Sequence, residues 1–221
     1  MNRLNRIQIA QRAAREIASG AYVNLGIGLP TLIADMISPE REVFLHSENG
    51  LLHFGRRPGN DKVDPCLINA SKQPVTLYPG AAIFDSALSF SMMRGGHLDL
   101  AVLGAYEVAE NGDLANWTRS DPGIPPAVGG AMDLAFGAKQ VWVLMEHTTK
   151  DGLPRLLRRC TLPLTAAAVV TRIFTDLAVL SVTETGLLVE EMVEGLQFDK
   201  LQDMTEARLI QAVTLNRSNL V

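Results

Sequence analysis

The spacing of apolar residues predicts helices and short strands that alternate along the chain. An amphipathic helix is expected over residues 4–17, ending at Gly20, because apolar side chains recur every three to four residues and arginines fill the other face. Short apolar runs bounded by turn residues are typical of strands buried on both faces. Such runs occupy residues 22–25, 43–46, 98–103 and 140–145.

A proline and a capping residue mark further helices. They are expected from Pro30 to Ile37 and from Asp85 or Ser86 to Met93. Residues 177–182 and 187–189, separated by Thr185 and Gly186, predict a late hairpin. The pattern therefore indicates a single domain over residues 1–221 of the α/β class. We expect an open, mostly parallel sheet with helices on both faces and a small antiparallel hairpin element.

Glycine, proline and asparagine mark the connections. Residues 55–65 are expected to form a surface loop, and Pro79-Gly80 a turn after a short strand at residues 75–77. Asn111-Gly112 is typical of a turn between two short strands. The tail beyond Glu191 is predicted to be helical in part.

Glu48 is the first candidate for chemistry. It follows the apolar run that begins at Val43, and Asn49 and Gly50 behind it tolerate the positive φ of a tight turn. This turn places Glu48 at the carboxyl end of a buried strand, which is the edge of an open α/β sheet where ligands bind. The pattern alone leaves a solvated turn glutamate as an alternative.

Five ordered motifs resemble the small (B, or β) subunit of the class I CoA-transferases. The first is Ser-Glu-Asn-Gly-Leu-Leu at residues 47–52, which is similar to the active-site motif of that family. The other motifs follow in the family's order at residues 89–99, 112–117, 128–134 and 160–165. The resemblance extends from about residue 11 to residue 189 and implies the CoA-transferase fold.

The resemblance also implies a role for Glu48 and a partner for the chain. In the family this glutamate is the nucleophile, so Glu48 is expected to move CoA from succinyl-CoA to a 3-oxo acid by ping-pong chemistry through a glutamyl-CoA thioester. Coenzyme A would be a substrate, and no permanently bound cofactor or metal is expected. The small subunit of the family acts beside a larger A subunit, which implies a hetero-oligomer.

A glycine-rich loop follows the first predicted strand. Asn24, Gly26 and Gly28 belong to an Asn-Leu-Gly-Ile-Gly stretch, whose glycines let the backbone approach a ligand near a helix N-terminus. A dinucleotide fingerprint would need a third glycine where Thr31 stands. In the family the matching stretch lies beside the active site, which implies a part in binding CoA. A plain strand-to-helix turn stays open.

A second glycine loop spans residues 121–130. Prolines fix its approach, and Gly129 and Gly130 free the backbone at the entrance to a helix whose first turn carries Asp133. In the family these glycines lie at the CoA thioester, where a backbone amide contributes to an oxyanion hole, so Gly129 or Gly130 is expected to act there. Asn49, beside the nucleophile, is expected to bind CoA as well. A rigid connection without a ligand is the alternative.

Composition and charge restrict the other function classes. With 221 residues, 47% of them hydrophobic, the chain can bury one sizeable core. The net charge of −4, with a short basic patch at residues 155–159, argues against a nucleic-acid partner. No signal peptide or membrane-spanning run is recognisable, so a cytoplasmic protein is expected. Cys66 and Cys160 fit reduced thiols, and four scattered histidines lack metal-ligand spacing.

Two other functions stay open from the residues alone. Sugar-phosphate isomerases with related sheets also use carboxylates and glycine loops, and a catalytically silent regulatory subunit would keep the fold. The ordered motifs favour the transferase, and retention of Glu48 argues against a silent subunit. Glu146 and His147 follow the strand at residues 140–145 and would fit an acid and base pair, but they are expected to be structural.

The motifs do not decide between two possible acceptor acids, 3-oxoadipate and acetoacetate. Residues 89–94 and 124–130 resemble the 3-oxoadipate CoA-transferases, whereas residues 145–148 and 160–164 are as similar to enzymes acting on acetoacetate. After residue 52 the family usually has Gly-Met-Gly, and this chain has His-Phe-Gly-Arg-Arg. Arginine suits the distal carboxylate of a dicarboxylic acid, so Arg56 or Arg57 is expected to bind it. Solvated loop charges are the alternative.

Overall fold

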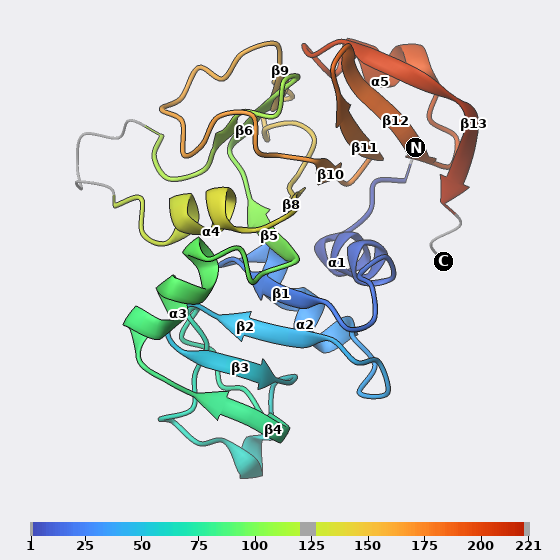
Figure 1. Ribbon diagram of the computed structural model, residues 1–221. Coiled ribbons are helices and arrows are strands. Elements are labelled where there is room, and N and C mark those ends of the chain that lie inside the picture. Colours follow the sequence, from blue (N-terminus) through green and yellow to red (C-terminus); the bar gives the residue numbers. More distant parts are fainter. Residues whose placement is uncertain (1, 120–126, 219–221) are drawn as a thin grey trace.

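The computed structural model describes residues 2–119 and 127–218. In this part of the chain, ten strands form one sheet and three form a second. The large sheet has the order β13-β12-β11-β10-β8-β5-β1-β2-β3-β4 (Figure 1). Its middle, from β10 to β2, is parallel, and antiparallel strands extend it on both sides. The predicted α/β class with a mostly parallel sheet and an added hairpin is confirmed.

The elements have the following bounds. The strands of the large sheet are β1 (Tyr22–Leu25), β2 (Phe44–Ser47), β3 (Leu51–Phe54), β4 (Leu77–Ile83), β5 (Leu100–Gly104), β8 (Val141–Leu144), β10 (Arg172–Phe174), β11 (Ala178–Thr183), β12 (Gly186–Val193) and β13 (Leu209–Ser218). The small sheet contains β6 (Glu107–Ala109), β7 (Leu114–Ala115) and β9 (Leu156–Leu157). The helices are α1 (Arg6–Ala14), α2 (Ile33–Met36), α3 (Ser86–Arg94), α4 (Ala131–Gly137) and α5 (Phe198–Asp203), with short 3₁₀ turns η1 (Leu29–Leu32) and η2 (Asn60–Lys62).

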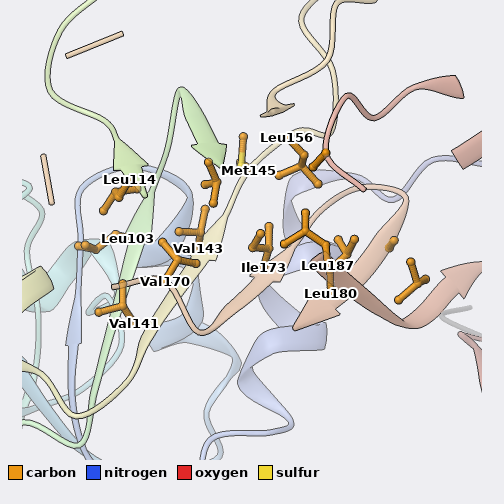
Figure 2. Close-up of a cluster of buried hydrophobic side chains, with 14 of the residues drawn as sticks. Leu103, Leu114, Val141, Val143, Met145, Leu156, Val170, Ile173, Leu180 and Leu187 are labelled. Atoms are coloured by element: carbon orange, nitrogen blue, oxygen red, sulfur yellow. The ribbon is translucent and has the colours of Figure 1, made fainter. Parts of the chain in front are cut away.

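The central strands are buried on both faces, and alternate residues enter two different cores. In β8, Val141 and Val143 join the core that includes residues of α3, α4 and the small sheet, whereas Trp142 and Leu144 join the core beneath α1 and α2. This alternation follows from the two-residue period of a strand. Figure 2 shows Val141 and Val143 with Ile173 of β10 in the first core.

The small sheet covers one end of the first core. Val108 of β6, Leu114 of β7 and Leu156 of β9 are fully buried in it, and Figure 2 shows Leu114 and Leu156 near the strands of the large sheet. The turn at Gly112 has a φ of +87°, as the predicted Asn-Gly turn requires. The chain enters the small sheet after the carboxyl ends of β5 and β8, since β6 follows β5 and β9 follows β8.

One predicted helix boundary and two residues expected to be buried need correction. α1 ends at Ala14, and Gly20 instead forms the turn before β1 with a φ of +80°. Ile7 was expected on the apolar face but is 56% exposed, because the buried face is set by Ile9 and the alanines that follow it. In α3, Leu88 was likewise expected in the core and is 51% exposed, whereas Met93 is fully buried.

Two predicted connections also differ from the structure. The expected Pro79-Gly80 turn lies inside β4, where Gly80 has a φ of +87°. β4 is an edge strand, so Pro79 can occupy it without a neighbour that needs its missing amide hydrogen. β13 was not predicted, since only a helix was expected in part of the tail. The first six residues of the proline loop, 121–126, lie outside the described residues.

Candidate active site

Glu48 lies in the turn that joins β2 to β3. Gly50 allows this turn, because its φ is +104° and a Cβ atom there would overlap the carbonyl oxygen of Phe84. β2 is the parallel neighbour of β1 and the antiparallel neighbour of β3. The turn therefore places Glu48 at the carboxyl edge of the parallel strands, where the sequence predicted it.

A cavity of about 570 Å³ opens at this edge of the sheet. Its lining includes residues at or after the ends of four neighbouring parallel strands, namely Glu48 after β2, Gly26 after β1, Ala105 after β5 and Met145 after β8. The volume is typical of sites for small molecules and cofactors. Glu48 therefore lies at one end of a cavity that extends along the edges of four strands.

Gly130 immediately precedes α4 and packs against the carboxylate of Glu48. A Cβ atom on Gly130 would overlap Glu48 Oε2 and lie 3.3 Å from Cζ of Phe90. Gly129 has a φ of +59°, and a Cβ atom there would meet open space. Both glycines line the cavity. Only at Gly130 is the absence of a side chain required, because a Cβ atom there would occupy the space of the Glu48 carboxylate.

Burial and a neighbouring carboxylate both raise the pKa of Glu48. Burial is the larger cause, because it disfavours the charged form, and the negative charge of Asp133 is the second. Asp133 lies in the first turn of α4 and forms an ion pair with Arg94, with 2.6 Å between Nε and Oδ1. Glu48 therefore ionises at a higher pH than an exposed glutamate.

His46 fixes the strand that carries Glu48. It is fully buried, and its Nδ1 accepts a hydrogen bond of 2.9 Å from Nδ2 of Asn24. Its Nε2 lies 3.1 Å from Oγ of Ser89 and therefore carries the ring hydrogen. Burial lowers the pKa of His46 to about 4, which keeps the ring neutral at physiological pH. The three side chains tie β1, β2 and α3 together beside Glu48.

A loop over residues 66–76 supports the other side of the turn. Ser47 Oγ accepts a 2.9 Å hydrogen bond from the amide of Ala70, and Asn49 Nδ2 donates a 2.8 Å bond to the carbonyl oxygen of Ile68. Asn69 closes this loop, because its Oδ1 accepts from two of the loop's own amides. Since Ala70 lines the cavity, the loop also forms one wall of the site.

Comparison with known proteins places this site in a family. A model of the family described as Coenzyme A transferase matches residues 6–204. This chain belongs to the Coenzyme A transferase family. The match covers Glu48, both glycine loops and the small sheet, so it includes every part of the cavity described above.

Relatives with assigned names agree with this membership. The B subunit of 3-oxoadipate CoA-transferase from Pseudomonas putida is 57% identical over 209 residues, which cover 95% of this chain and 98% of the relative. The B subunit of succinyl-CoA:3-ketoacid coenzyme A transferase from Helicobacter pylori is 50% identical over 199 residues, covering 90% and 95%. The structure of the acyl-CoA transferase YdiF from Escherichia coli O157:H7, in a thioester complex with CoA, has a TM-score of 0.71 at 20% identity. It covers 96% of this chain, which spans 42% of YdiF, and it shows a shared fold.

Not all of the residues predicted to bind CoA lie in the cavity of this Coenzyme A transferase. Glu48 shares the lining with Asn24, Gly26, Gly129 and Gly130. Gly28 does not belong to that lining, and with a φ of +96° it turns the chain into η1. Asn49 is exposed, and its amide group bonds to the supporting loop rather than pointing to a ligand.

Arg56 and Arg57 are not at the cavity. Both are exposed, and the backbone amide of Arg57 donates to Oδ1 of Asp35 over 3.2 Å. The reason is the direction of β3, which runs antiparallel to β2 and carries the chain away from Glu48 at ~3.3 Å per residue. The structure therefore gives no geometric support to their predicted contact with the acceptor acid.

Sequence reasoning missed the cations that do line the cavity. They are Arg6, Arg119 and Arg155. Arg119 has its Cζ atom 4.5 Å from the ring centre of Tyr106, which follows β5. Sequence reasoning also missed His46. A polar residue within each of two apolar runs, Asn24 and His46, could have indicated it, and the structure pairs these two residues across β1 and β2.

Glu146 and His147 have different environments. His147 is fully buried, with Nδ1 3.0 Å from Oγ1 of Thr175 and Nε2 2.8 Å from Oγ1 of Thr205. Burial lowers its pKa to about 4, so this residue ties elements together as a neutral ring. Glu146 is exposed and lines the cavity three strands away from Glu48.

Other expectations concern metals, membranes and thiols. Within residues 2–119 and 127–218, no group of three or more His, Cys, Asp or Glu side chains is arranged to hold a metal ion. No helix in the same described part is long and apolar enough to cross a membrane. Both cysteines are free thiols, and burial raises the pKa of Cys160 to about 12.

Proposed function

We propose that this chain is the B subunit of a 3-oxoacid CoA-transferase that moves CoA from succinyl-CoA to 3-oxoadipate or acetoacetate. The observation that carries the proposal is the carboxylate of Glu48, held against Gly130 at the end of a cavity of about 570 Å³. The names of the Pseudomonas putida and Helicobacter pylori relatives, each at least half identical to this chain, support the same reaction. A sugar-phosphate isomerase has no comparable support, and a silent subunit would not need this arrangement.

Glu48 acts as the nucleophile without a general base, because a glutamate is ionised at neutral pH. One of its carboxylate oxygens attacks the carbonyl carbon of the acyl-CoA thioester, the C–S bond breaks, and CoA leaves as a thiolate. The product of this step is a mixed anhydride. The thiolate then attacks Cδ of Glu48 and releases the first acid, which leaves a glutamyl-CoA thioester. The acceptor carboxylate repeats both steps in reverse.

Each attack places negative charge on a carbonyl oxygen. Backbone amides at Gly129 and Gly130 are suited to stabilise this charge, because they precede α4 and line the cavity beside the nucleophile. One such donor is worth roughly 3 to 4 kcal/mol in an acyl-transfer enzyme. His46 and the loop over residues 66–76 act by positioning, since they bond to β2, to its turn and to the residues beside it.

The proposal includes a partner and a location. The two relatives compared above are named as B subunits, so we expect an A subunit that completes the site in a hetero-oligomer. Residues 1–221 then act as one cytoplasmic domain with CoA as a substrate. Exposed apolar side chains, among them Ile27 at 68% and Phe136 at 63%, are compatible with coverage by another subunit.

The covalent intermediate provides the decisive experiment. The chain, purified with its A subunit and incubated with succinyl-CoA, should gain the mass of CoA on the peptide that contains Glu48. Borohydride should then reduce the thioester at that side chain to an alcohol. Intact and peptide mass spectrometry measure both changes, and turnover is followed with 3-oxoadipate and acetoacetate.

Two controls make the experiment specific. Glu48→Gln keeps the shape of the side chain and should abolish both the adduct and turnover. The chain without its A subunit should show no turnover. An adduct that survives in Glu48→Gln, or full activity of the isolated chain, would contradict the proposed nucleophile or the proposed partner, respectively.

A further inference from the structure

Two arginines lie at the end of the cavity that is remote from Glu48. The amide of Arg155 donates a 3.2 Å hydrogen bond to the carbonyl oxygen of His147, which places Arg155 just beyond β8. Arg6 begins α1, and two residues before it the amide of Leu4 bonds over 2.9 Å to the carbonyl oxygen of Asp176, beyond β10. Both arginines line the cavity.

Neither guanidinium group has an ion pair or a side-chain hydrogen bond among the described residues. Four other arginines of the fold, Arg3, Arg12, Arg94 and Arg172, pair with carboxylates, whereas Arg6 and Arg155 line a cavity without such a pair. Arg155 is also half-buried, and a cation that loses water without a partner is costly. Among the carboxylates of the cavity lining, Glu146 is the nearest to Arg155 in sequence. Its single negative charge cannot balance the two positive charges of Arg6 and Arg155.

The width of the sheet shows how far this end lies from the nucleophile. β8 and β2 are separated by β5 and β1, so three strand spacings of ~4.8 Å place the two ends about 14 Å apart. At ~1.5 Å per carbon–carbon bond, the two carboxyl carbons of a six-carbon diacid are at most about 6 Å apart. The same bond length gives about 16 Å between the sulfur atom and the pyrophosphate of extended CoA.

We infer that Arg6 and Arg155 form a subsite for the phosphate groups of CoA, with the pantetheine arm crossing β1 and β5 toward Glu48. The inference rests on the proposed function, because it takes CoA as the ligand. Phosphates supply the anions that these cations lack, and arginine can bind them with two parallel hydrogen bonds. The distal carboxylate of an acceptor acid is too near the reacting carbon to reach this end.

A thioester donor that lacks phosphates can show whether the two arginines bind the phosphates of CoA or a carboxylate of the acyl group. We would compare succinyl-CoA with succinyl-pantetheine, which keeps the thioester and the acyl carboxylate but lacks the nucleotide and all phosphates. The proteins are the native complex with its A subunit, the variants Arg155→Gln and Arg6→Gln, and the control Arg158→Gln. Arg158 is exposed, lies in the same basic patch as Arg155, and is not part of the cavity lining.

The expected result is selective. Arg155→Gln should lower kcat/KM for succinyl-CoA roughly 10- to 100-fold, the effect of one hydrogen-bonded charge, and leave succinyl-pantetheine unchanged. Arg6→Gln should act in the same direction, and Arg158→Gln should change neither donor. The dependence of KM on salt should also weaken in Arg155→Gln, because a screened charge pair has been removed.

Equal losses with both donors, or no loss with either, would overturn the inference. Circular dichroism and the thermal midpoint of each complex distinguish an unfolded variant from a binding defect. If the native complex transferred neither donor, the proposed function would fail while the subsite stayed testable by calorimetry with CoA. Weaker CoA binding by Arg155→Gln would then support the subsite, and unchanged binding would overturn it.

Discussion

Gly130 lies so close to Glu48 that any side chain would displace the carboxylate. The group in the way is the end of a flexible side chain, so Gly130→Ala should fold and move Glu48 instead of disrupting the core. Displacing a reacting group by about 1 Å can lower the reaction rate about 10²-fold. We therefore expect kcat to fall by about that factor, with a small change in the KM for CoA and in the free energy of unfolding.

The neighbouring glycine provides the matched control. Gly129→Ala adds the same methyl group in open space, and its cost is the strain of a positive φ, about 1 kcal/mol of stability. Both variants keep their backbone amides, so neither deletes a donor of the proposed oxyanion hole. Steady-state kinetics and urea unfolding of both variants are the measurements, and equal values of kcat would show that contact with Glu48 is unimportant.

Helix α4 brings a second carboxylate toward Glu48. Asp133 in its first turn raises the pKa of Glu48 in addition to the effect of burial. Asp133→Asn removes that negative charge, so the pKa of Glu48 should fall. Because attack needs the ionised form, the acidic limb of kcat/KM should move to lower pH. Acetoacetyl-CoA is the suitable donor, since its acyl group carries no carboxylate of its own.

The ion-pair partner of Asp133 gives a change of opposite sign. Arg94→Gln leaves the charge of Asp133 unbalanced, so the pKa of Glu48 should rise and the acidic limb should move to higher pH. The ionisations of the substrate are the same for all three proteins and cancel in the comparison. Acidic limbs that coincide in all three proteins would contradict an electrostatic coupling between α4 and Glu48.

The elements predicted best from the sequence are those with a uniform environment. β1, β5 and β8 are buried on both faces, so an apolar run suffices to reveal them. α3 was also found, because Asp85 caps it with a bond to the amide of Leu88. β4 and β13 lie at the two edges of the sheet, where a strand tolerates proline or polar residues, and there the pattern failed.

The site as a whole depends on contacts that no local pattern encodes. Glu48 and the glycine loops could be predicted from the sequence, because each follows a strand or precedes a helix at one sheet edge. Arg6 and Arg155 come from the start of α1 and from the segment before β9, and only the sheet order brings them to one end of the cavity. Arg56 shows the converse, since it is close to Glu48 in sequence but lies beyond the far end of β3.

The molecule also contains two fully buried histidines that affect its stability toward acid. Burial lowers the pKa values of His46 and His147 to about 4, whereas an unfolded chain protonates histidine near pH 6.5. The unfolded chain therefore binds more protons between pH 6.5 and 4. The stability contributed by the neutral rings is present above pH 6.5 and is lost as the pH falls to about 4. Each histidine can account for about 3 kcal/mol over this window.

Urea unfolding of the isolated chain, followed by tryptophan fluorescence from pH 7.5 to 4.0, measures this loss. We expect the free energy of unfolding to fall by at most ~1.4 kcal/mol per pH unit for each histidine. Glu48 opposes part of the fall, because its raised pKa makes the folded chain take up that proton first. His46→Gln should be less stable at neutral pH and show a shallower pH dependence. His97→Gln, at an exposed position, should keep the native slope, and an unchanged slope in His46→Gln would contradict a role for the buried ring.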